Sequence, residues 1–114
     1  MGKDYPLIKC KITVLKCTFN QELVDQFVEV ERKKTLGPCE VFHEGQEFLV
    51  DPWAGLPQGF CPWAWDDIYK VIIAFGANGN FGFWTESGDT IISCCTDATR
   101  PVIFKIDKII LDEK

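Results

Sequence analysis

The chain has 114 residues, of which 46% are hydrophobic and 25% charged, with a formal net charge of −5 and a pI near 4.8. This length suits one domain with a single modest core. The acidic balance argues against nucleic acid and against a membrane surface as partners, because both need a positive field. A small molecule, a protein partner and a second copy of the chain (a homo-oligomer) all stay open.

No segment has the length of a membrane span, and the first residues lack the apolar stretch of a signal peptide. We therefore expect a cytoplasmic protein. In a reducing compartment, three structural disulfides are a poor explanation for its six cysteines. We expect the cysteines to serve as metal ligands, cluster ligands, redox groups or core residues.

The first expected element is a strand over residues 7–19. Even-numbered positions from Ile8 to Val14 are apolar and alternate with polar residues. The apolar phase then slips to an odd-numbered row that includes Cys17, as a β-bulge in a curved sheet or small barrel would produce. Because Cys10 and Cys17 both fall in apolar rows, we expect both in the core, where free cysteine is common.

A short helix is expected next, with Asn20 as its N-cap and an apolar stripe that should pack on the sheet. The stripe consists of Leu23, Val24, Phe27 and Val28. Residues 39–51 then indicate two short strands about a turn at Glu44-Gly45. Residues 52–60, with two prolines and two glycines, predict a rigid loop that leads to Cys61.

Cys61-Pro62 begins the second expected helix. Proline is favoured at the first helical position, so Cys61 falls at or beside the N-cap, near unpaired N–H groups and the positive end of the helix dipole. That position favours the thiolate, the form of cysteine that binds metals, holds iron–sulfur clusters and attacks electrophiles. Asp66 and Asp67 oppose this effect if they lie close. A packing role for Cys61 is the alternative.

The second helix should run from Trp63 to Phe75 and stop at Gly76. Its predicted inward face consists of Ala64, Trp65, Ile68, Val71, Ile72 and Phe75. A hairpin is expected from residues 81–85 and 90–96, which flank a turn-forming loop.

A last strand should follow Arg100-Pro101, with Val102, Phe104 and Ile106 as its inward row. This order of elements predicts the α+β class. We expect a single compact domain over residues 1–114, with two helices and a strongly curved sheet, mostly antiparallel or mixed.

Cys94 and Cys95 are adjacent on an expected strand, so their side chains point to opposite faces. If Ile92 and Cys94 face inward, Cys95 lies on the other face or at the strand end, just before a polar turn. Cys95 is therefore the better candidate ligand. Six aromatic residues could line a pocket over the thiols and exclude water from it, with a core role as the alternative. They are Trp53, Trp63, Trp65, Trp84, Phe81 and Phe83.

Three stretches of the chain form a recurring combination of motifs. They are Gly37-Pro38-Cys39 with Phe42, Glu44-Gly45-Gln46 and Phe48; Gly59-Phe60-Cys61 with Ala64-Trp65 and Ile68-Tyr69; and Cys95 with Asp97 and Arg100-Pro101-Val102-Ile103-Phe104-Lys105. In these residues, over nearly its whole length, the chain resembles a family of small uncharacterised three-cysteine proteins of anaerobic bacteria and archaea. The resemblance implies one site of Cys39, Cys61 and Cys95, with the other three cysteines outside the pattern. It implies no activity.

Three thiols from separate segments suit a metal ion or an iron–sulfur cluster, which is our main expectation. A tetrahedral zinc site would add His43 or Cys94 as fourth ligand. A cluster on three cysteines would leave one iron open to substrate. The alternatives are an accessory domain whose cysteines only pack, and a dithiol redox protein in which Cys61 attacks and Cys39 or Cys95 resolves. Whether the chain is an enzyme stays open.

Overall fold

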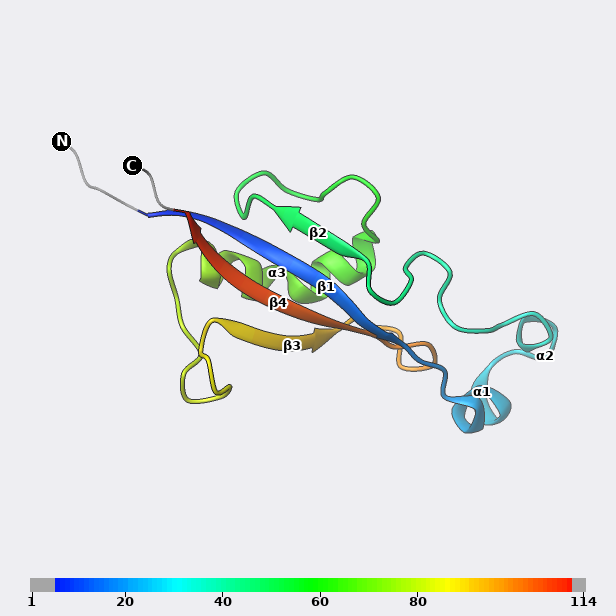
Figure 1. The fold of residues 1–114 in the computed structure, drawn as a ribbon. Coiled ribbons are helices and arrows are strands. Elements are labelled where there is room, and N and C mark those ends of the chain that lie inside the picture. Colours follow the sequence, from blue (N-terminus) through cyan, green and yellow to red (C-terminus); the bar gives the residue numbers. More distant parts are fainter. Residues whose placement is uncertain (1–5, 112–114) are drawn as a thin grey trace.

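A computed structural model describes residues 6–111. Within this range, four strands form one antiparallel sheet in the order β2-β1-β4-β3, and three helices accompany it (Figure 1). The strands are β1 (Leu7–Cys17), β2 (Glu47–Val50), β3 (Thr90–Cys94) and β4 (Val102–Leu111). The helices are α1 (Gln21–Phe27), α2 (Val30–Lys33) and α3 (Pro62–Gly76). The expected α+β class is confirmed. No helix in this range is long and apolar enough to span a bilayer.

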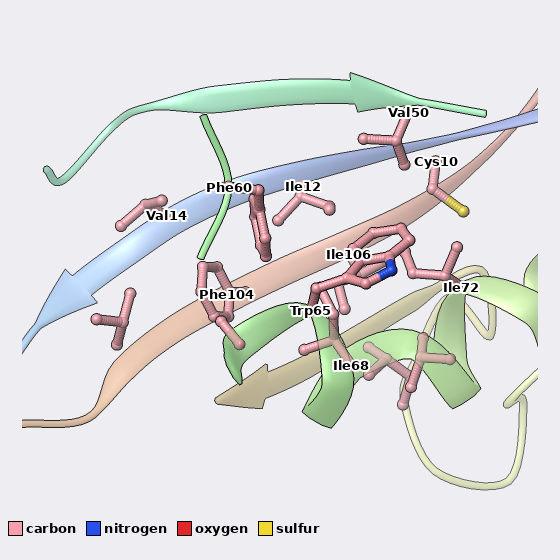
Figure 2. Packing of buried hydrophobic residues seen from close by; sticks show 14 of the residues in the cluster. Cys10, Ile12, Val14, Val50, Phe60, Trp65, Ile68, Ile72, Phe104 and Ile106 are labelled. Carbon is pink, nitrogen blue, oxygen red and sulfur yellow. The ribbon is translucent and has the colours of Figure 1, made fainter. Parts of the chain in front are cut away.

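Helix α3 covers one face of the sheet, and the core lies between them (Figures 1 and 2). It begins at Pro62 after Cys61 as N-cap, as the sequence predicts. All six of its predicted inward residues are buried. The inner face of the sheet includes Ile12 on β1 and Phe104 and Ile106 on β4, each fully buried. Burying side chains of this size stabilises a fold by about 1.5–3 kcal/mol each, so this layer is the main source of stability.

Strand β1 contains the predicted bulge. Its pairing with β4 runs regularly to Val14↔Phe104, shifts by one residue, and resumes at Lys16↔Ile103 and Cys17↔Val102. Leu15 is the extra residue. A one-residue insertion exchanges the two faces of the strand beyond it, so an odd-numbered residue now takes the inner face.

Helix α1 does not pack on the sheet, contrary to expectation. It lies with α2 beyond the end of the strands (Figure 1), and of its stripe only Val24 is buried, whereas Phe27 is 76% exposed. The side chain of Asn20 does not cap the helix but donates a hydrogen bond to the carbonyl of Ala98. Helix α1 is only seven residues long, and α3 already covers the apolar face of the sheet. The third helix, α2, was not expected.

Two predicted strands are absent from the described residues. Residues 81–85 form turns instead, because Phe81 donates to the Gly88 carbonyl at 2.7 Å and the Asn80 side chain accepts from Gly82 at 2.7 Å. Residues 39–43 also form no strand, although the turn at Glu44-Gly45 is present and only β2 follows it. Backbone groups that bond within a turn are not free for a ladder.

Strand β3 has the opposite phase to the one considered. Ile91 pairs with Ile106 and is buried, whereas Ile92 is 50% exposed. Cys94 pairs with Ile103 and is exposed. Two adjacent isoleucines contain no alternation, so only the pairing with β4 decides which of them faces α3.

Candidate thiol site

A pocket of about 70 Å³ lies where α3 begins and β4 starts, and Cys39, Cys61 and Cys95 all line it. Each of the three is half-buried and packs against the hydrophobic core. The three residues predicted as one site are therefore brought to one pocket from three separate segments. Among the aromatic residues considered for this role, only Trp63 lines it.

Cys61 is held at the helix start by its neighbours. The Phe60 ring packs against Phe42 at 4.9 Å and Phe48 at 5.0 Å between ring centres, which fixes the end of the preceding loop. Trp65 N–H donates to the Cys61 carbonyl at 2.9 Å as the first bond of the helix. The Cys61 side chain makes no capping hydrogen bond, so its sulfur is not tied to the helix.

Cys95 is attached directly to the first residue of β4. Its backbone N–H donates to the Val102 carbonyl at 3.1 Å, and Val102 N–H donates to the Cys95 sulfur at 3.4 Å. The sulfur also lies 3.9 Å from the Arg100 carbonyl. These contacts fix the Cys95 sulfur at the start of β4.

The turn from β3 to β4 is fixed by Asp97. Its carboxylate accepts from the Thr99 hydroxyl at 2.6 Å and from Arg100 Nε at 2.9 Å. Burial acts to raise the pKa of Asp97, but the bonds from Thr99 and Arg100 and the charge of Arg100 outweigh it, so the pKa is lowered. Both Asp97 and Arg100 line the pocket. The rim of the thiol site is therefore a stiff ion-paired turn.

Cys39 lies in the loop between α2 and β2 and borders two pockets. Besides the thiol pocket it lines a neighbouring pocket of about 270 Å³, together with Arg32 and Arg100. Cys39 is therefore the member of the site that borders two arginines as well as the other thiols.

Cys17 is a fourth cysteine in this region; it was predicted in the core, and it packs against the core as a half-buried residue. It is half-buried at the end of β1, where its sulfur contacts the Phe42 carbonyl at 3.5 Å. Burial raises the pKa of Cys17, and the neighbouring Cys39, Glu44 and Cys95 raise it further. The signal for this residue was the phase slip after Val14, which puts position 17 on the inner face.

The other candidates lie elsewhere. His43 is exposed on the turn, with Nδ1 3.5 Å from the Glu44 carbonyl, and does not line the pocket. Cys94 is exposed on the opposite face of the sheet from Cys95. Cys10 is fully buried in the core, as expected, and burial raises its pKa to about 11.

All six cysteines are free thiols. Within residues 6–111, no group of three or more His, Cys, Asp or Glu side chains is positioned to hold a metal ion. A shared pocket and a formed coordination shell are different properties, and only the first is present here. An ion would require the sulfurs to turn towards a common point.

Comparisons of the chain with protein-family models, with curated proteins and with solved structures give no match. The resemblance in sequence therefore stays a prediction.

Proposed function

We propose that the pocket is a thiolate site that binds zinc, iron or an iron–sulfur cluster through Cys39, Cys61 and Cys95. The observation that supports this is the convergence of three half-buried free thiols, remote in sequence, on one pocket. Cysteine thiolates are preferred ligands of zinc and of iron–sulfur clusters.

The types of residue that line the pocket are suitable for binding such an ion. Three sulfurs are available, and the N–H of Val102 already bonds to one of them. Arg100 lines the same pocket and favours negative charge there. Coordination requires side-chain rotation, because the sulfurs are not yet arranged about one point. Rotation about a single bond is a small change for a half-buried cysteine.

The pocket has room for a single ion. A buried water needs about 10–15 Å³ of such space. The pocket, at about 70 Å³, therefore has room for a few water-sized groups. With three protein ligands, the ion would keep a position open to substrate, whereas a fourth would make it structural.

Dithiol redox chemistry is a second function for the same pocket. The unbonded sulfur of Cys61 at the helix start is the observation that favours it. In that reaction the Cys61 thiolate attacks a partner disulfide and one partner sulfur leaves as thiolate. Cys39 or Cys95 then attacks the mixed disulfide, which releases the second partner thiolate and leaves the chain oxidised. An accessory role with packed cysteines is the remaining alternative.

The test is purification under anaerobic conditions, followed by metal and acid-labile sulfide analysis with an optical spectrum. We expect about one zinc or iron per chain in the wild type and in Cys94→Ser, whose thiol is exposed on the other face, and none in Cys61→Ser. Iron with sulfide would indicate a cluster. Neither metal nor sulfide in the wild type would contradict the proposal, and a reversible disulfide within the pocket would then support redox chemistry.

A further inference from the structure

We propose that Arg32 and Arg100 bind the carboxylate of a small organic acid in the pocket beside Cys39, and that such an acid is the substrate of the thiol site. The substrate role rests on the proposed function, whereas the binding of the acid does not. The pocket is the one of about 270 Å³ that shares Cys39 and Arg100 with the thiol pocket.

The first support is the position of the arginines. Twelve residues of the chain are lysine or arginine, and only Arg32 and Arg100 are arginines. Although they are far apart in the sequence, both line this one pocket, and no lysine of the described residues does so. A guanidinium is planar and presents its N–H groups as a rigid fork that matches the two oxygens of a carboxylate, unlike an ammonium ion. Two arginines without a lysine therefore indicate an oxyanion as the ligand.

Arg100 is held in place for such a ligand. It lies in the turn between β3 and β4, where its Nε donates to Asp97 Oδ2 at 2.9 Å. A guanidinium has five N–H donors, so this bond leaves others free. A side chain that is already fixed loses less conformational entropy when a ligand binds.

Arg32 has no carboxylate partner among the described residues. It lies in α2, where its backbone N–H donates to Glu29 Oε1 at 2.9 Å. The neighbouring Glu31 pairs instead with Lys34 at 3.0 Å. None of the ion pairs within residues 6–111 includes Arg32. Arg32 can therefore bind an external carboxylate without first breaking an ion pair.

The acidic groups around the pocket favour a singly charged ligand. Glu40 lines the pocket and is exposed, and Asp97 pairs with Arg100. These two carboxylates balance the charges of the two guanidinium groups. A phosphate group carries a charge of about −1.5 to −2 at neutral pH and finds no excess positive charge here. A carboxylate carries one negative charge and still matches the arginine fork.

The size and the walls of the pocket suit a small acid. Its volume of about 270 Å³ lies just below the roughly 300–1,000 Å³ of typical small-molecule sites. Leu36, Pro38 and Val41 give it an apolar wall beside the arginines. A short alkyl chain can pack against this wall while the carboxylate contacts Arg32 and Arg100.

Cys39 connects the acid to the thiol site. It is half-buried and lines both pockets, as Val41 and Arg100 do. An ion held by three cysteines keeps one position open, and a carboxylate oxygen is an accepted ligand of zinc. An acid bound by Arg32 and Arg100 therefore lies next to the pocket in which we propose the ion.

The test is an NMR titration of the metal-free, reduced full-length protein with butyrate, and with butyramide as its uncharged counterpart. We expect butyrate to shift the amide signals of residues 35–41 to saturation and butyramide to leave them unchanged. Arg32→Gln, at an exposed position where the fold should be kept, should weaken butyrate binding by at least about tenfold, as expected for the loss of a hydrogen bond to a charged group.

Lys70→Gln is the matched control, because it removes one positive charge from the exposed surface of α3. Its affinity for butyrate should equal that of the wild type. Glu40→Gln should bind butyrate more tightly, because it removes a like charge from the pocket. The inference is overturned if the wild type shows no saturable shift with butyrate, if butyramide gives the same response, if inorganic phosphate binds more tightly, or if Arg32→Gln keeps the wild-type affinity.

The link to the thiol site is tested by alkylation with iodoacetamide, followed by mass spectrometry. We expect saturating butyrate to slow the modification of Cys39 and to leave the exposed Cys94 as reactive as before. An unchanged rate at Cys39 would overturn the substrate role. Butyrate binding by a wild type that holds neither metal nor sulfide would remove the proposed function and keep the carboxylate site, whereas metal binding without butyrate binding would do the reverse.

Discussion

Cys10 and Cys17 occupy the same strand and face the same side of the sheet, but their surroundings differ. Cys10 is fully buried beneath α3 (Figure 2), and burial raises its pKa to about 11. Cys17 is half-buried at the strand end, where its sulfur bonds to the Phe42 carbonyl. Burial raises its pKa, and the neighbouring Cys39, Glu44 and Cys95 raise it further. The first residue belongs to the apolar core cluster, whereas the second has polar groups as neighbours. Position along a strand therefore decides how polar the surroundings of a cysteine are.

The largest expected effect comes from removing the ring that separates these two regions. Phe104 is fully buried and its ring packs against Phe42 at 5.2 Å and Phe60 at 5.5 Å. Phe104→Ala should lower the free energy of unfolding by about 3–5 kcal/mol, measured by urea denaturation. The control Phe83→Ala, at a ring that is 85% exposed, should change it by less than about 0.5 kcal/mol. Equal effects would contradict the assigned core.

The next largest expected effect is on the reactivity of the buried Cys10 thiol. A pKa of about 11 instead of 9.0 leaves Cys10 with about 100-fold less thiolate than an ordinary cysteine, and burial slows its modification further. Under native conditions at pH 8, Cys10 should react with iodoacetamide more than 100-fold more slowly than the exposed Cys94, as followed by mass spectrometry. Similar rates at Cys10 and Cys94 would show that the sheet opens readily beneath α3.

Serine substitution should sharpen the same contrast. Cys10→Ser buries a hydroxyl among apolar side chains, and an unsatisfied buried polar group costs about 1–3 kcal/mol. Cys17→Ser keeps a donor beside the Phe42 carbonyl and should cost less than about 1 kcal/mol. Both are measured by denaturation of the metal-free protein. A greater loss for Cys17→Ser would mean that Cys17 is a core residue.

The smallest expected effect concerns the turn at the rim of the pocket. The lowered pKa of Asp97 means that its stabilisation is fully present above its ordinary value of 3.8 and is lost as the pH falls through the lowered pKa. Asp97→Asn should therefore be less stable than the wild type at neutral pH, and the difference should shrink below pH 3.8. The exposed Glu86→Gln is the control. A difference independent of pH would contradict the assigned ion pair.

Periodic elements were predicted well from the sequence. The buried faces of helix α3 and strand β4 are the ones predicted. Each element packs against one partner layer, so its apolar residues recur with the period of the helix or strand. The bulge in β1 was also visible, since its apolar phase changes after Val14.

Features that depend on remote partners were not predicted. The stripe of α1 is regular, but the sequence does not say that α3 takes the apolar face of the sheet. The phase of β3 depends on its pairing with β4. For the same reason Cys17 could be placed on the inner face, but its pairing with Val102, the residue to which Cys95 bonds from the other side, could not be predicted.

The most direct test of the proposed thiolate site is X-ray absorption at the zinc edge, on wild-type protein loaded with one equivalent of Zn²⁺. The account predicts a shell with three sulfur neighbours at about 2.3 Å and one lighter neighbour. Cys61→Ser should lose one of the three sulfurs, and Cys94→Ser, whose thiol is exposed on the other face, should match the wild type. A wild-type shell made only of nitrogen and oxygen, or an ion left free in solution, would contradict the account.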